Sequence, residues 1–237
     1  MKLKGIVPRV WRKVKRVLLV LFLAQLVYII ILRWVNPPFT PTMVWTWLSL
    51  LGSREHFQKT WVNYQQISPY AKLAVMAGED QQFPEDDGFD IKAMEEAFRH
   101  NEKSKHIRGG STISQQVAKN VFLWQGKSYF RKGLEAYFTF MIEKIWGKKR
   151  ILEMYLNVAQ TGPGIFGFEA AAQFYYGKSA RTLDREEAAM IAAALPNPVR
   201  FKIKPPSRFT LWRQGKLLVQ MHNIADDPKV EALIREK

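Results

Sequence analysis

The sequence contains no cysteine, only four histidines, and 21 acidic residues against 36 basic ones. The absence of cysteine excludes a disulfide framework, a thiolate metal site and a cysteine nucleophile. The histidines are scattered without the spacing of a zinc site, so we expect structural or surface roles for His56, His100, His106 and His222. The shortage of acids gives a net charge of +15, which is compatible with an anionic lipid surface or with nucleic acid.

A membrane-spanning segment is predicted near the N-terminus. The first sixteen residues hold seven lysines and arginines and no acid, and residues 17–32 are almost entirely apolar. This run is slightly shorter than the ~20 residues that cross a bilayer, but Arg16 and Arg33 can extend toward the headgroups and Trp34 suits the interface. A cleavable signal peptide would need a small-x-small site, which does not follow, and a buried core helix would not carry so many flanking cations.

We therefore predict a single-pass anchor at residues 17–35, preceded by a basic tail at residues 1–16 that stays in the cytoplasm by the positive-inside rule. The rest of the chain then lies on the periplasmic, or outer, side of the cytoplasmic (inner) membrane. Residues 36–52 are a proline-rich and then apolar membrane-proximal segment. Residues 36–41 predict a stiff, extended connector, and residues 43–51 form either a core segment or a patch that dips into the bilayer through Trp45 and Trp47.

Residues 53–237 make up the predicted globular domain, and helical signals dominate it. Apolar residues recur at helical spacing from residue 68 onward, whereas strand signals are few and short. Thr112 with Gln115 predicts a capping box, and the glycine-rich residues 161–167 predict a loop. The expected fold class is mainly α.

An acidic stretch at residues 79–88 stands out in this basic chain because it holds five carboxylates. Ser68 and Pro69 predict the start of an apolar helix, and Gly78 weakens its end, so Glu79 leaves a buried element at the edge of a loop. A carboxylate at such a junction is partly desolvated, which raises its pKa and suits it to general acid or base catalysis. The alternative is an ordinary solvated acidic loop.

Residues 109–116 join a Gly-Gly loop to a helix start that is rich in hydroxyls and amides. Exposed N–H groups at a helix start favour an anion, and sugar hydroxyls or phosphate oxygens can be bound by Ser111, Thr112, Gln115 and Gln116. A Gly-Gly loop with an N-cap is common, so this motif is weak on its own.

Arg131, Lys132 and Glu135 lie three and four residues apart on a predicted helix, so they share one surface. They form either an ordinary surface ion pair or a clamp in which Glu135 orients the two cations around a phosphate or holds a divalent metal bridged to a pyrophosphate. Further along, Glu153 and Asn157 share another helix face, where we expect a structural role that joins this helix to its neighbours.

Four stretches together resemble the motifs of the peptidoglycan glycosyltransferases (glycosyltransferase family 51), in that family's order. They are EDQQFPEDDG, GGSTISQQ continuing through VAKN, RKGLE and KKRILEMYLN, within residues 72–198. The single anchor, the small size and the absence of Ser-x-x-Lys and Lys-Thr-Gly motifs resemble the monofunctional members and not the bifunctional penicillin-binding proteins.

The resemblance implies a lysozyme-like, two-lobed α fold that polymerises lipid II into β-1,4-linked glycan strands, with inversion and release of undecaprenyl pyrophosphate. It implies that Glu79 is the general base on the acceptor's 4-hydroxyl. It also implies that Glu135, with Arg131 and Lys132, stabilises the departing pyrophosphate together with a divalent cation (Mg²⁺ or Mn²⁺), and that Lys119 is a further phosphate contact. The implied donor site is lined by Ser111, Thr112, Gln115 and Gln116. The partners implied are lipid II, the growing glycan strand, the membrane, and cell-wall synthesis or division proteins.

One position departs from the family pattern. The first motif usually has a histidine three residues after the phenylalanine, whereas Asp86 stands three residues after Phe83 here. A hydrogen-bonding aspartate can replace a structural histidine, so we expect activity to survive.

Two other functions fit part of the pattern. A lytic transglycosylase or lysozyme would use one acidic Glu to cleave glycan, but cleavage needs no pyrophosphate clamp. A catalytically weak, membrane-tethered scaffold of the cell-wall machinery would not need both Glu79 and Glu135. Nucleic-acid binding is not expected, because the predicted anchor places the domain outside the cytoplasm and no recognised binding module occurs.

Overall fold

The computed structural model describes residues 6–53, 56–103, 110–126 and 128–235. The start of the predicted tail (residues 1–5), His106 and Gly109 of the Gly-Gly loop lie outside the described residues. The chain forms two compact units, Met1–Pro38 and Phe39–Lys237.

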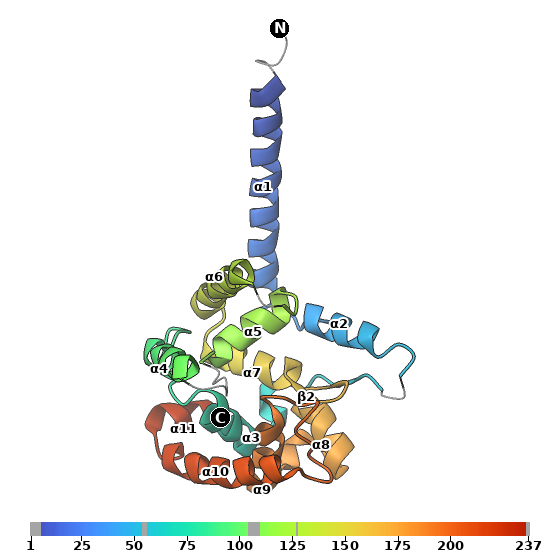
Figure 1. Ribbon diagram of the computed structural model, residues 1–237, viewed down its shortest axis with the longest axis vertical. Coiled ribbons are helices and arrows are strands. Elements are labelled where there is room, and N and C mark those ends of the chain that lie inside the picture. The colour runs from blue at the N-terminus through green and yellow to red at the C-terminus, as the bar shows by residue number, and fades with distance from the viewer. Residues whose placement is uncertain (1–5, 54–55, 104–109, 127, 236–237) are drawn as a thin grey trace. The chain divides into compact units, whose positions relative to one another are not determined.

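The first unit contains one long helix, α1 (Ile6–Ile31) (Figure 1). Its segment Trp11–Ile31 is long and apolar enough to cross a membrane, which fits a single-pass membrane protein. The helix begins at Ile6, within the residues predicted as a basic tail. Arg12 and Arg16 therefore lie inside the same helix as the apolar segment.

The second unit is mainly α, as the sequence predicts. Its helices are α2 (Pro41–Ser49), α3 (Pro69–Glu79), α4 (Ile91–Lys103), α5 (Ile113–Phe122), α6 (Tyr129–Ile145), α7 (Lys148–Val158), α8 (Phe168–Tyr176), α9 (Arg185–Ala194), α10 (Arg208–Ile224) and α11 (Pro228–Ile234), with 3-10 turns η1 (Tyr64–Gln66) and η2 (Ala180–Thr182).

The predicted helix starts are confirmed by their caps. Ser68 accepts a hydrogen bond from the Tyr70 backbone N–H, and Pro69 occupies the first turn of α3. Thr112 and Gln115 form a reciprocal capping box at the start of α5. These caps fix where α3 and α5 begin, and both helices carry candidate site residues.

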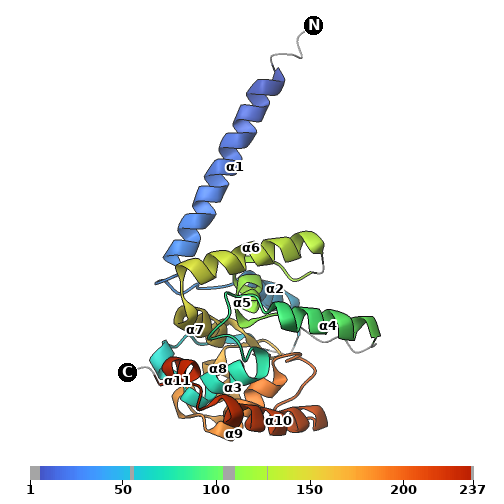
Figure 2. The same cartoon turned by 90° about the vertical axis from the view of Figure 1, so that its left-hand side faces the viewer.

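The helices of the second unit pack in two groups (Figures 1 and 2). In one group α3 packs against α9, α10 and α11, and alanines on α3 and α9 are fully buried between them. In the other group α5 packs against α6, α7 and α2, and α7 also contacts α3. The ends of α3 and α5 that carry the acidic and amide motifs therefore belong to different groups.

A small sheet accompanies the helices. Its strand order is β1 (Gln58–Lys59), β3 (Ile165–Phe166) and β2 (Gln160–Gly162), with β1 parallel and β2 antiparallel to β3. The prediction of a simple loop at residues 161–167 is therefore wrong. Strands of two or three residues are too short to show the alternating pattern by which a strand is recognised in a sequence. They form here because β1 and β2 both pair with β3.

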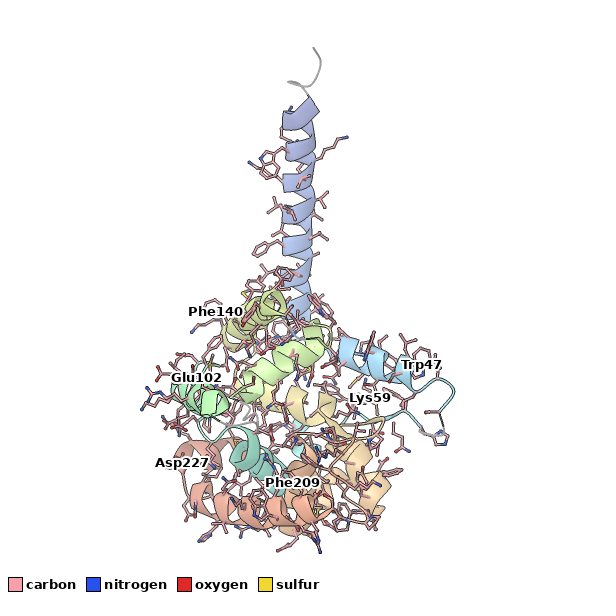
Figure 3. The ribbon with its side chains drawn as sticks, in the orientation of Figure 1. Trp47, Lys59, Glu102, Phe140, Phe209 and Asp227 are labelled. Atoms are coloured by element: carbon pink, nitrogen blue, oxygen red, sulfur yellow. The ribbon has the colours of Figure 1, made fainter. Side chains whose placement is uncertain are left out.

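Helix α2 has features of both alternatives considered for residues 43–51. Thr42 and Met43 are buried, whereas Trp45 is 64% and Trp47 is 48% exposed. Figure 3 shows Trp47 on the outer side of α2, and Phe140, which is also exposed, on α6. One face of α2 therefore belongs to the core, and the other presents tryptophans to the surroundings.

Candidate active site

Glu79 is the last residue of α3, and only 10% of its side chain is exposed. Residues 71–77 of this helix are buried, which fixes its end against the core. The Gln116 Nε2 atom donates to Glu79 Oε2 at 2.9 Å, and the Arg213 Nη2 atom donates to Glu79 Oε1 at 3.1 Å. Three helices, α3, α5 and α10, thus hold this carboxylate in one orientation.

The environment of Glu79 suits proton transfer. Burial raises the pKa of Glu79 above its ordinary value, and the hydrogen bonds and charges of Gln116, Arg213 and Lys119 oppose part of this increase. The sequence prediction of a partly desolvated carboxylate at the end of α3 is therefore confirmed. A carboxylate whose pKa is raised is a stronger base, which suits it to accept a proton from a substrate hydroxyl.

Gln116 links Glu79 to a buried tyrosine. The Tyr155 hydroxyl on α7 donates to Gln116 Oε1 at 3.2 Å, while the amide nitrogen of Gln116 serves Glu79. Tyr155 is 1% exposed, and burial raises the pKa of its hydroxyl well above the ordinary value. Sequence analysis did not single out Tyr155, because an aromatic residue on an amphipathic helix is most often a core residue.

Glu135 forms the second acidic centre, on α6. It is 3% exposed, and its two carboxylate oxygens form direct ion pairs with Arg131 and Lys132. The Lys132 ammonium also donates to Ser111 Oγ at 3.3 Å. The buried Glu135 and the largely buried Arg131 differ from an ordinary surface ion pair, whereas the Lys132 side chain is 42% exposed.

The triad is well suited to an anion. Two cations surround one carboxylate, so a positive charge remains. The Arg131 Nε–H is buried and has no hydrogen-bond partner among the described residues, which leaves a donor available to a phosphate oxygen.

Lys119 lies within electrostatic reach of both acidic centres. Burial lowers the pKa of Lys119, the charges of Glu135 and Glu79 raise it, and the charges of Arg131 and Lys132 lower it further. Lys119 and Gln116 are three residues apart on α5, so one helix face carries both the amide that binds Glu79 and the cation that lies in the field of both centres.

The residues predicted to line the donor site divide into two kinds. Ser111 and Gln116 are partly exposed and touch Lys132 and Glu79. Thr112 and Gln115 are buried and bond to each other in the capping box, and the Thr112 hydroxyl donates to the Gly88 carbonyl at 2.8 Å. The latter pair positions α5 and the acidic loop relative to each other.

Asp86, which replaces the usual histidine, lies in a buried ionic cluster. Lys148 Nζ lies 2.7 Å from Asp86 Oδ1 and 2.8 Å from Glu143 Oε1, and both acidic side chains are 6% exposed. Glu143 also accepts from the Ser114 hydroxyl. The aspartate therefore connects the acidic loop to α6 and α7 through Lys148, which supports the structural role expected at this position.

Asp80 is the neighbour of Glu79 and caps the C-terminal end of α3. It accepts from the Ile113 backbone N–H at 3.0 Å, at the start of α5. Burial and the nearby Asp86 raise the pKa of Asp80 to about 7. Sequence analysis treated Asp80 only as part of the acidic stretch.

The expected structural role of the polar pair on α7 is confirmed. Glu153 accepts from the Tyr64 backbone N–H, and Asn157 bonds to both the N–H and the carbonyl of Val62. These contacts fix the segment before α3 to α7, and with it the helix that ends in Glu79.

A cavity of about 310 Å³ opens beside Gln116 and Lys119. Its walls come from α2, α5, α7 and the segment after α9, and they include Trp45, Asn120 and Tyr155. Hydroxyl, amide and aromatic groups of this kind suit a carbohydrate or another polar ligand.

The described residues offer no cage for a divalent cation. No group of three or more His, Asp or Glu side chains converges among them in a way that could hold a metal ion. Each oxygen of Glu135 already forms an ion pair, one with Arg131 and the other with Lys132.

Comparison with known proteins identifies the family of this chain. Residues 48–222, which are more than half of the chain, match the family model described as Transglycosylase. The chain therefore belongs to the transglycosylase family, and the expected lysozyme-like α fold is confirmed.

Its relatives include proteins named biosynthetic peptidoglycan transglycosylase. The protein from Shewanella oneidensis is 44% identical over 225 residues, which cover 93% of this chain and 94% of the relative. The protein from Xylella fastidiosa is 46% identical over 208 residues, 86% of each chain, and one from Escherichia coli is 52% identical over 195 residues, 81% of each chain.

Proposed function

We propose that this protein is a peptidoglycan glycosyltransferase that polymerises lipid II into β-1,4-linked glycan strands and releases undecaprenyl pyrophosphate. The observation that carries the proposal is that two carboxylates with different surroundings both lie in the electrostatic field of Lys119. Glu79 is a desolvated carboxylate with a raised pKa, whereas Glu135 is neutralised by two cations. Glu79 is suited to remove a proton, and the cations around Glu135 are suited to stabilise an anionic leaving group.

In this reaction Glu79 accepts the proton of the acceptor's 4-hydroxyl as that oxygen attacks the anomeric carbon of the donor. Gln116 and Arg213 each donate to a different oxygen of the carboxylate, and carboxylate oxygens keep further lone pairs for the incoming hydroxyl. Because the base and the leaving-group site belong to different helices, attack opposite to the departing phosphate, with inversion, is consistent with the arrangement.

The departing pyrophosphate is stabilised by Arg131, Lys132 and Lys119. Their charges are partly buried, which strengthens their effect on the negative charge that develops in the transition state. Glu135 orients Arg131 and Lys132. A divalent cation, if it takes part, is carried by the phosphate oxygens of the substrate, and Lewis-acid neutralisation of the leaving group is the chemistry it would supply.

We further propose that the protein is anchored in the cytoplasmic (inner) membrane with its N-terminus in the cytoplasm. The apolar segment of α1 and its basic start support this orientation. The exposed tryptophans of α2 support contact between the second unit and a bilayer, where the lipid-linked substrate lies. Cell-wall synthesis or division proteins are the proposed protein partners.

The test is polymerisation of lipid II by the full chain in detergent. Glu79→Gln and Glu135→Gln are each expected to lower the rate by about 100-fold or more, because general base catalysis and leaving-group stabilisation contribute factors of this size. Glu186→Gln, at an exposed position in the first turn of α9, is the matched control and should retain wild-type activity. Shortening of existing strands by the wild-type protein would favour a lytic enzyme, and a Glu79→Gln variant as active as wild type would favour a scaffold.

A further inference from the structure

Tyr155 makes a contact that the proposed reaction does not use. Its hydroxyl lies 3.2 Å from Gln116 Oε1, and Gln116 Nε2 lies 2.9 Å from Glu79 Oε2. The three side chains come from α7, α5 and α3, so they form a chain of hydrogen bonds across the junction of the two helix groups.

The direction of this chain follows from the groups themselves. An ionised Glu79 can only accept, so the amide must present its NH₂ group to the carboxylate and its oxygen to Tyr155. The tyrosine hydroxyl is then the donor. A reversed amide would bring its oxygen within 2.9 Å of a carboxylate oxygen and place two acceptors in contact.

We propose that Tyr155 is a positioning residue that orients the Gln116 amide toward Glu79 and thereby stabilises the ionised carboxylate. This inference rests on the proposed role of Glu79 as the general base. The hydroxyl fixes the amide in one orientation and also polarises it, because consecutive hydrogen bonds strengthen one another in a site of low dielectric constant. Both effects make the amide N–H a better donor to negative charge.

The position of Tyr155 suits this role. Its neighbours Met154 and Leu156 are fully buried, so α7 holds the tyrosine ring in place. Burial raises the pKa of the Tyr155 hydroxyl well above its ordinary value, and the charge of Glu79 acts in the same direction. The hydroxyl therefore keeps its proton, and can donate it, throughout the neutral range.

The charged groups that face this chain come from three elements. Arg213 on α10 and Lys119 on α5 favour the ionised form of Glu79. Asp80, at the end of α3, acts with Glu79 to keep the Tyr155 hydroxyl protonated. These groups remain in place when only the tyrosine hydroxyl is removed, so its contribution can be measured separately.

The test is the pH dependence of kcat/KM for lipid II polymerisation by the full chain. Tyr155→Phe removes one hydroxyl and keeps the ring. We expect the acidic limb of the profile to move to higher pH by roughly half to one unit, which corresponds to the loss of one hydrogen bond. Above this limb the rate should approach that of wild type, and KM should change little. A uniform decrease at every pH, or an unmoved limb, would overturn the proposal.

Tyr64→Phe is the matched control. Tyr64 is also buried, and its hydroxyl donates to the backbone carbonyl of Leu233 at 2.7 Å. This variant should lose stability without moving the acidic limb. In a Gln116→Ala background, Tyr155→Phe should cause no further movement, whereas an additive effect would show that Tyr155 does not act through Gln116.

A second substitution of the tyrosine keeps the test decisive if Tyr155→Phe does not fold. Tyrosine carrying one ring fluorine at position 155 has a more acidic hydroxyl and is a stronger donor, so the acidic limb should move to lower pH. An unchanged limb would count against the proposal. If the wild-type chain makes no glycan from lipid II, the proposed function fails, whereas an active wild type with unmoved limbs contradicts only the role of Tyr155.

Discussion

Arg213 donates to Glu79 across 134 positions of sequence, with Nη2 3.1 Å from Oε1. The same nitrogen donates to the Gly78 carbonyl at 3.1 Å, so α10 holds both the end of α3 and its terminal carboxylate. The charge and hydrogen bond of Arg213 oppose the increase in the pKa of Glu79 that burial causes. The position of α10 is therefore part of the proposed base.

Removal of the guanidinium is expected to impair the base more strongly at low pH than at high pH. Arg213→Gln removes a favourable charge, which raises the pKa of Glu79 further and moves the acidic limb of kcat/KM up by about one to two pH units. Arg185→Gln is the control, since Arg185 also donates to a backbone carbonyl, that of Leu218 on α10. Equal profiles for the two variants would contradict this role of Arg213.

The buried cluster around Lys148 is expected to contribute stability. Asp86→Asn leaves the Lys148 ammonium with Glu143 alone, and we expect the free energy of unfolding to fall by about 1–3 kcal/mol. Asp87→Asn provides the control, because the Asp87 side chain is 91% exposed and lies 3.6 Å from Lys144 at the surface. Thermal unfolding in detergent measures both variants.

The aspartate in place of histidine is also expected to be compatible with catalysis. Since Asp86 Oδ1 already binds the Lys148 ammonium and the Gly88 N–H and joins the acidic loop to α7, Asp86→His should give no gain in polymerisation over wild type. An inactive wild-type protein that gains activity through Asp86→His would show that the imidazole has a role in the reaction.

The raised pKa of Asp80 is expected to make the free energy of unfolding depend on pH. Its folded-state pKa of about 7 exceeds the ordinary value of 3.8, so the native state binds more protons than the unfolded state between these values. The contribution of Asp80 to the free energy of unfolding therefore falls as pH rises from about 4 to about 7, by up to roughly 1.4 kcal/mol per pH unit. Asp80→Asn keeps an acceptor for the Ile113 N–H and should flatten this slope. An equally steep slope in the variant would exclude Asp80 as its source.

Gly167 is expected to tolerate no side chain. Its φ is +84°, and a Cβ there would lie 2.8 Å from the Asn157 carbonyl oxygen, so Gly167→Ala combines backbone strain with a collision. We expect a loss of about 3 kcal/mol or more in the free energy of unfolding. Gly177 has a φ of +68° and open space around it, so Gly177→Ala should cost only about 1 kcal/mol. A smaller loss at Gly167 than at Gly177 would contradict the close approach.

Local sequence signals predict much of this fold. Glu153 and Asn157 lie on one helix, α7, as predicted, and the capping side chains of α3 and α5 lie where the sequence places them, because these features depend on residues within one or two turns. The desolvation of Glu79 and the shared surface of Arg131, Lys132 and Glu135 follow from the same local rules. The resemblance to a known family supplied the roles of these side chains.

Long-range contacts could not be predicted in this way. The chain has 36 basic residues, and nothing in the periodicity of α10 indicates that Arg213 is the one that reaches Glu79. The contact between Tyr155 and Gln116 and the ion pairs of Lys148 likewise depend on how helices pack. The hairpin of β2 and β3 was missed for a different reason, because its strands are too short to show a periodic pattern.

Gln116 and Lys119 lie on one face of α5, the first bonded to Glu79 and the second within the field of both Glu79 and Glu135. A small molecule that binds against this face of α5 and displaces the helix would move Gln116 and Lys119 together. It would thereby impair both activation of the nucleophile and departure of the lipid carrier. Resistance to such an inhibitor could not arise by repairing either function alone.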